Sequence, residues 1–165
     1  MKPIEEGPGT LETDAVLVRA MQVSDLEPVV AIDAAGSGRR RPSYFNRMLE
    51  RAIKHADLQI SLVAELEGQV VGFVVGTHYY GEFGVVEPSA TIDAISVDPR
   101  WRRKQVGKAL LRQLRLNLGA LRITTLRTEV PWDDFDLLAF LRREGFTPAD
   151  RLCLECPLDP TSPVD

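Results

Sequence analysis

The residues of this chain that are best suited to bind a ligand lie in a basic segment from Arg100 to Leu118. It begins with Arg-Trp-Arg-Arg-Lys-Gln-Val-Gly-Lys and follows a strand-like apolar run that ends at Asp98 and Pro99. A strand, a basic turn with a glycine and a helix together form a recurring site for a phosphate, because the first N–H groups of a helix lack internal partners and the helix dipole places positive charge there. Apolar residues at helical spacing predict the helix: Val106, Leu110, Leu114, Leu118 and Leu121.

The charges of the chain are unevenly placed. Its 165 residues carry a formal net charge of −4, but no acidic residue stands between Asp98 and Glu129. A local cationic strip on an acidic protein suits a small polyanion such as a nucleotide cofactor, whereas the overall acidity argues against a general nucleic-acid binder. The alternative is a basic helix face that meets solvent. The basic residues of the strip are Arg100, Arg102, Arg103, Lys104, Lys108, Arg112, Arg115, Arg122 and Arg127.

The segment from Val97 to Leu111 resembles the acetyl-CoA signature of the GCN5-related N-acetyltransferase (GNAT) family. The pattern of that family is a hydrophobic strand, often Val-x-Pro, followed by Arg/Gln-x-x-Gly-x-Gly/Ala at the start of a helix. Arg102 fills the Arg/Gln position and Gly107 the last glycine. Gln105 stands where the first glycine is usual, which keeps the N–H donor but adds a side chain near the phosphates.

The resemblance implies an acetyl-CoA-dependent N-acetyltransferase that passes the acetyl group directly to a primary amine in a ternary complex. Members of the family hold the pyrophosphate against backbone amides of the signature turn, and the pantetheine arm pairs with the preceding strand. By position, the cofactor-binding residues would be Ile95, Ser96 and Val97 on the strand and Arg102, Arg103, Lys104, Gln105, Val106, Gly107 and Lys108 in the turn. The acceptor stays open between a small amine, an antibiotic, a peptide N-terminus and a lysine.

Asp93 is the first candidate for the general base that removes a proton from the amine. It interrupts an apolar strand just before the cofactor-binding residues and shares a strand face with Thr91. Members of the family often carry an acid or a histidine at one of these two positions. Glu82 and Glu87 are alternatives, since they would lie on the neighbouring strand or its loop. The structural alternative is a solvent-facing or salt-bridged strand acid.

The general acid departs from the family pattern. It is usually a tyrosine in the last helix, four residues before a Gly-Phe pair, and here that position holds Leu141. Water, Tyr79 or Tyr80 could protonate the thiolate, or the thiolate could leave unaided. Together with Gln105, this departure motivates a second hypothesis, a non-catalytic acyl-CoA sensor or interaction module on the same fold.

The elements that must position these residues follow from periodicity and turn signals. Strands are predicted over 15–21, 58–65, 70–75, 91–97, 123–130 and 151–156, and helices over 25–34, 43–55, 106–121 and 134–144. Ser24, with Glu27 three residues later, is the expected cap of the first helix, and Gly145 that of the last. The order β-α-α-β-β-β-α-β-α-β predicts an α/β fold on one mixed sheet, and this order also resembles the GNAT fold.

We expect a single domain over 15–156, with a flexible segment at 1–14 and a flexible tail at 157–165. The loop of Arg39, Arg40 and Arg41 lies between the first two helices, where the family commonly shapes its acceptor pocket. It could bind an acidic substrate or face solvent. Homodimers are common in the family, and the resemblance is compatible with one here.

Composition and cysteine spacing bear on three further classes: membrane-spanning, secreted and metal-binding proteins. No apolar run approaches the ~18 residues that span a bilayer, and the acidic N-terminus does not resemble a signal peptide, so a cytoplasmic protein is expected. Cys153 and Cys156 form a Cys-x-x-Cys pair, but a zinc site would need His55 and His78, which are distant in sequence. Residues three apart on a strand face opposite sides, so reduced cysteines and no metal are expected.

Overall fold

The computed structural model describes residues 16–54, 60–80 and 87–158. The expected flexible segment at 1–14, His55, Glu82 and most of the expected tail lie outside these residues. The chain forms two compact units, Met1–Glu129 and Val130–Asp165. The first contains the sheet and the signature segment, and the expected single domain over 15–156 stays a prediction.

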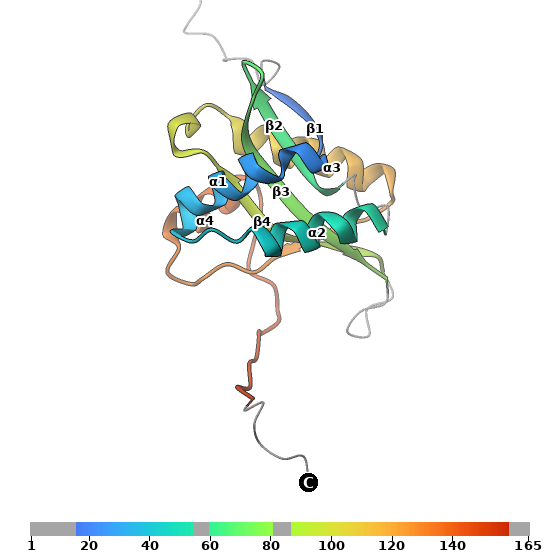
Figure 1. Ribbon diagram of the computed structural model, residues 1–165. Coiled ribbons are helices and arrows are strands. Elements are labelled where there is room, and N and C mark those ends of the chain that lie inside the picture. Colours follow the sequence, from blue (N-terminus) through green and yellow to red (C-terminus); the bar gives the residue numbers. More distant parts are fainter. Residues whose placement is uncertain (1–15, 55–59, 81–86, 159–165) are drawn as a thin grey trace, which may run out of the picture. The chain divides into compact units, whose positions relative to one another are not determined.

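The first unit is built on a five-stranded sheet in the order β1-β2-β3-β4-β5. Neighbouring strands run antiparallel except β4 and β5, which are parallel and are joined through a helix. The sheet in Figure 1 therefore confirms the predicted α/β class with one mixed sheet. The strands are β1 (Leu17–Ala20), β2 (Leu62–Leu66), β3 (Gln69–Tyr79), β4 (Ser89–Val97) and β5 (Thr125–Thr128).

Helices cover both faces of this sheet. α1 (Leu26–Ser37) and α2 (Pro42–Lys54) lie on one face, and α3 (Val106–Ala120) lies on the other (Figure 1). Phe73 of β3 packs in the buried cluster formed with α1 and α2, whereas Gly72 beside it approaches α3, as the alternation of side chains along a strand requires. Within the described ranges, no helix combines the length and the apolar character needed to cross a membrane.

The start of the first helix differs from the prediction. A 3₁₀ turn, η2 (Val23–Asp25), precedes α1, and Ser24 lies inside this turn instead of capping the helix. The Asp25 carboxylate accepts a 2.7 Å hydrogen bond from the Gln22 N–H and pairs with the Arg19 guanidinium at 2.7 Å. Burial alone would raise the pKa of Asp25, but the hydrogen bonds from Arg19 and Gln22 and the charge of Arg19 lower it. This pair ties β1 to the 3₁₀ turn that precedes α1.

The strand predicted over 151–156 is not formed, and residues 151–158 have no regular secondary structure. Leu152, Leu154 and Leu158 are exposed. The local sequence predicted a strand, but a strand also needs hydrogen bonds from a neighbouring strand, which a local pattern cannot supply. Cys153 and Cys156 are exposed, and neither belongs to a disulfide within the described part of the chain.

The second unit contains α4 (Phe135–Arg143), which the end signals of the sequence predicted correctly. The Asp134 carboxylate accepts a 3.1 Å hydrogen bond from the Leu137 N–H at the start of the helix. Gly145 follows the last turn with φ of 87°, the left-handed conformation that this type of helix end requires.

β4 contains an irregularity at Asp93. Consecutive residues of β3, Val75 and Gly76, pair with Ala94 and Ile92, so Asp93 is the extra residue of a β-bulge. A Cβ built on Gly76 would lie 2.7 Å from a carbonyl oxygen of β4. The glycine therefore permits the close approach of the two strands beside the bulge, and the bulge sets the direction of the Asp93 side chain.

Gly76→Ala is expected to destabilise the protein, and Gly119→Ala is its matched control. A methyl group at position 76 would press on backbone that cannot rotate away, which should lower the free energy of unfolding by about 1–3 kcal/mol. Gly119 lies in α3 with nothing within 4 Å of a built Cβ, so the same change there should be neutral or stabilise by up to ~1 kcal/mol. Urea unfolding followed by circular dichroism measures both, and equal stabilities would contradict the close approach at Gly76.

Candidate functional site

The signature turn starts from an anchored carboxylate. The Asp98 N–H donates to the Val71 carbonyl oxygen at 2.8 Å, which fixes the exit from β4. The Asp98 side chain accepts a 2.9 Å hydrogen bond from the Arg100 N–H and forms a 2.7 Å ion pair with the Arg100 guanidinium. Hydrogen bonding from the Arg100 side chain lowers the pKa of Asp98. The pair opens the 3₁₀ turn η5 (Pro99–Trp101), from which the chain leads into α3.

The turn contains two residues with left-handed backbone. Arg103 and Gln105 both have φ of 62°, a conformation that costs an ordinary residue about 1–2 kcal/mol and that is common at ligand sites. Gln105 is the N-cap of α3, and its side chain makes no capping hydrogen bond. The Ala109 N–H donates to the Gln105 carbonyl oxygen at 2.9 Å, so the amides of 106–108 precede the first helical hydrogen bond and have no acceptor within the helix.

The side chains around these amides are cationic. Arg102, Arg103, Lys104 and Lys108 are exposed, and the Lys104 ammonium lies 4.8 Å from the centroid of the Trp101 ring. An anion at this helix end would meet free N–H groups, the positive end of the helix dipole and several cations. The turn therefore suits the pyrophosphate of coenzyme A, and the role of each predicted residue stays a prediction.

β4 and β5 separate part-way along β4. Their pairing covers residues 89–92 of β4, whereas β4 continues to Val97. Among the described residues, no strand pairs with 93–97 on the β5 side. Backbone groups on that edge have no ladder partner, so an extended ligand can hydrogen-bond to them as an added strand would. The predicted pantetheine-binding residues Ile95, Ser96 and Val97 lie in this open segment.

Asp93 lies where the open segment of β4 begins. The Thr77 hydroxyl donates to Asp93 Oδ2 at 2.7 Å, and the Arg51 Nη2 lies 3.6 Å from the same oxygen. Arg51 Nη2 also donates to Thr77 Oγ1 at 2.8 Å, so the three side chains contact one another. The Asp93 side chain is 20% exposed, and a carboxylate that is held in place yet open to solvent can accept a proton from an amine.

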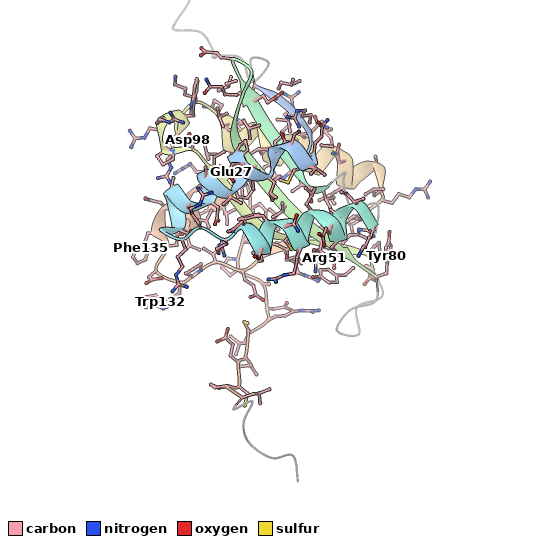
Figure 2. All side chains as sticks on the ribbon, in the orientation of Figure 1. Glu27, Arg51, Tyr80, Asp98, Trp132 and Phe135 are labelled. Atoms are coloured by element: carbon pink, nitrogen blue, oxygen red, sulfur yellow. The ribbon has the colours of Figure 1, made fainter. Side chains whose placement is uncertain are left out.

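The signature turn and Asp93 lie toward opposite ends of the open segment of β4. Figure 2 shows Asp98 at the turn, and it shows Arg51 and Tyr80 far from it, near the other end of β3 and β4. Arg51 projects from α2, which covers this end of the sheet. A ligand held by the turn and by the open segment would therefore extend toward Asp93.

Two arginines of the loop between α1 and α2 are paired within the protein. The Arg40 guanidinium lies 2.6 Å from Glu27. The Arg41 guanidinium forms two hydrogen bonds, of 2.6 and 2.9 Å, to the buried carboxylate of Asp33. The loop was expected either to bind an acidic substrate or to face solvent, and these pairs commit Arg41 to holding a buried acid.

Sequence reasoning missed Arg51 and Thr77, which contact Asp93. Arg51 is a charged residue on an amphipathic helix and Thr77 a β-branched residue in a strand, so neither carries a local signal of function. They become neighbours only because α2 packs across β3. Tyr44 of α2 also lies near, since its pKa is raised by burial and then by the negative charge of Asp93.

The other predicted candidates lie elsewhere or outside the described residues. Glu82 is outside them, and Glu87 is exposed just before β4. Tyr79 and Tyr80 lie at the end of β3, and the Tyr80 side chain is largely exposed. Leu141 is buried in α4 of the second unit. Among the described residues there is no group of His, Cys, Asp and Glu side chains that could hold a metal ion.

Comparison with known proteins places these features in a family. The family model of the acetyltransferase (GNAT) family matches residues 28–146. Ard1 from Thermoplasma volcanium is similar in structure, with 25% identity, a TM-score of 0.68, and coverage of 81% of this chain and 83% of that one. A ribosomal-protein-alanine N-acetyltransferase from Brucella melitensis biovar Abortus 2308 has 20% identity, a TM-score of 0.68, and coverage of 88% and 100%.

A third solved structure shares the fold. Glucosamine-6-phosphate N-acetyltransferase from Arabidopsis thaliana has 18% identity and a TM-score of 0.66, with coverage of 88% of this chain and 100% of that one. The matched residues of the family model include the open segment of β4, the signature turn and α3. This chain therefore belongs to the GNAT acetyltransferase family.

Proposed function

We propose that this protein transfers the acetyl group of acetyl-CoA directly to a primary amine of an acceptor. The observation that carries the proposal is the open segment of β4, which connects an anion site at the signature turn with the held carboxylate of Asp93. Acetyl-CoA supplies a reactive thioester, and the amine must be neutral to attack it. N-acetyltransferases for a ribosomal-protein alanine and for glucosamine-6-phosphate have the same fold, which supports an amine as the acceptor.

The cofactor would be held mainly by backbone groups. The amides at the start of α3 and the exposed cations Arg102 and Lys104 would neutralise the pyrophosphate. The amide groups of the pantetheine arm would pair with the open segment at Ile95, Ser96 and Val97. Such a cradle tolerates Gln105 in place of glycine, because the N–H donor survives the change.

Asp93 would accept the proton of the attacking amine, directly or through water. Thr77 and Arg51 both approach Oδ2, and within the described part of the chain no hydrogen bond reaches Oδ1. The Oδ1 atom is therefore the oxygen that can face the acceptor. Thr77 and Arg51 act as positioning residues, because they fix the orientation of the carboxylate.

The CoA thiolate would take its proton from water or leave unprotonated, because Leu141 has no proton to donate. The same residue favours the alternative function, a non-catalytic acyl-CoA sensor on this fold. The two functions differ in one measurable quantity, the release of free CoA thiol when an amine is present.

Acetyl-CoA is expected to stabilise the protein against heat, and Arg102→Glu should remove most of that effect. A ligand that binds only the folded state adds ~2.7 kcal/mol at a hundredfold excess over Kd, and reversing a charge beside the phosphates should weaken binding about tenfold or more. Arg112→Glu makes the same charge change on an exposed position further along α3 and should keep the shift. No shift in wild-type melting temperature with millimolar acetyl-CoA would reject the cofactor site.

Asp93→Asn is expected to lower kcat/KM for amine acetylation by about 10²–10⁴, the usual contribution of a general base. The affinity for acetyl-CoA should stay unchanged, because Asp93 is not part of the phosphate site. Thiol release with a panel of amino acids, peptides and polyamines measures activity, and Glu87→Gln serves as the comparison. A loss with Glu87→Gln and none with Asp93→Asn would move the base to Glu87, and thiol release by no amine in the wild type would favour the sensor.

A further inference from the structure

We propose that the acceptor carries an oxyanion, a carboxylate or a phosphate, close to its amine, and that Arg127 and Arg51 bind this group beside Asp93. The inference rests on the proposed function and adds a substrate class to it. It depends on which side chains share one face of the sheet, how their charges balance, and how far apart they lie. All of these residues belong to the first compact unit.

One polar face of the sheet presents both arginines. Thr77 of β3 is in register with Thr91 of β4, and Thr91 is in register with Arg127 of β5. Residues in register on neighbouring strands direct their side chains to the same face. Arg51 reaches this face from α2, where its Nη2 donates to Thr77 Oγ1 at 2.8 Å. The two arginines therefore approach the same polar surface from the helix and from the sheet.

Two of the charged side chains named on this face are arginines, and one is a carboxylate. The carboxylate is Asp93, and Arg51 lies 3.6 Å from it. The partner of Arg127 in the described ranges is a neutral group, the Ser89 hydroxyl, which accepts from Nη1 at 3.2 Å. Arg127 is partly buried, and a partly buried guanidinium with unused donors favours an anion as its partner.

The spacing suits one small ligand. Thr77 and Arg127 lie two strand spacings apart, about 10 Å between Cα atoms, so two long arginine side chains can approach one group from both sides. The planar fork of a guanidinium matches two oxygens of a carboxylate or a phosphate. An acceptor whose oxyanion binds the arginines and whose amine lies a few bonds away would place that amine near Asp93. Such an acceptor complements all three charged groups.

Two alternatives fit the charges of the protein less well: a polycationic acceptor and an anion site in the loop at 39–41. A polycationic amine would bring like charges toward Arg127 and Arg51, which costs binding energy. The loop at 39–41 is a weaker anion site, because Arg40 pairs with Glu27 and Arg41 with Asp33. The Arg51 side chain is 46% exposed, so its ion pair with Asp93 contributes little to stability and leaves the guanidinium open to a ligand.

The test compares amines that differ chiefly in the oxyanion. Alanine is paired with alaninamide, and O-phosphoethanolamine with ethanolamine. Each is measured for thiol release with acetyl-CoA and, by calorimetry, for binding to the full chain saturated with CoA. The variants are Arg127→Gln, the conservative Arg127→Lys, Arg51→Gln, and a control, Arg112→Gln, on α3 at the opposite face of the sheet.

The wild type should prefer the oxyanion member of a pair by roughly 10–100-fold in kcat/KM and in Kd. Arg127→Gln should remove most of this preference through KM, Arg127→Lys should restore part of it, and Arg112→Gln should keep it. Arg51→Gln should also lower kcat, because Arg51 positions Asp93. A larger preference in the alanine pair would indicate a carboxylate, and a larger preference in the phosphoethanolamine pair would indicate a phosphate.

Three results would overturn the inference: equal use of both members of each pair, a preference that survives Arg127→Gln, or no binding of any of the four amines. A different result separates it from the proposed function. Oxyanion-selective binding that Arg127→Gln abolishes, without thiol release from any amine, would support the anion site and reject the transferase.

Discussion

The incomplete pairing of β4 is the constraint on which the site depends. β4 pairs with β3 along nearly its whole length, but β5 follows it only through residues 89–92. The bulge at Asp93 falls where the pairing with β5 ends, and it directs an acid to the face on which α2 packs. Gly76 permits the close approach of backbone that the bulge needs. The signature turn and Asp93 are thereby joined by one strand.

The arginines of the first unit divide according to their partners. Arg19 and Arg41 pair with the buried carboxylates of Asp25 and Asp33, which would be costly to bury alone. These pairs hold β1, α1 and the loop before α2 in place. Arg51, by contrast, is shared between Thr77 and the partly exposed Asp93. Arginine thus stabilises the fold where it pairs with a buried carboxylate. Where no buried carboxylate binds it, as at Arg51, the guanidinium remains available to a ligand.

Much of the fold could be predicted because its elements carry strong local signals. The apolar spacing of α3 and the glycine at 145 each act within a few residues of chain. Predictions failed where another residue took the predicted role or where a strand needed a neighbouring strand to pair with. Ser24 lies inside a 3₁₀ turn instead of capping the helix, and in this turn the Asp25 carboxylate accepts from the Gln22 N–H and pairs with Arg19 of β1. The segment 151–156 forms no strand, although its apolar residues alternate.

The sequence by itself determined the family and the signature helix, and it predicted Asp93 as the candidate base, because a motif and its flanking periodicity are contiguous in the chain. Only the tertiary structure decided what surrounds that acid. Arg51 and Thr77 contact it from a helix and a strand far from β4 in sequence, and Arg127 of β5 shares the face of Thr77 through strand register. Register and packing are set by long-range hydrogen bonds and burial, which no local pattern of residues encodes.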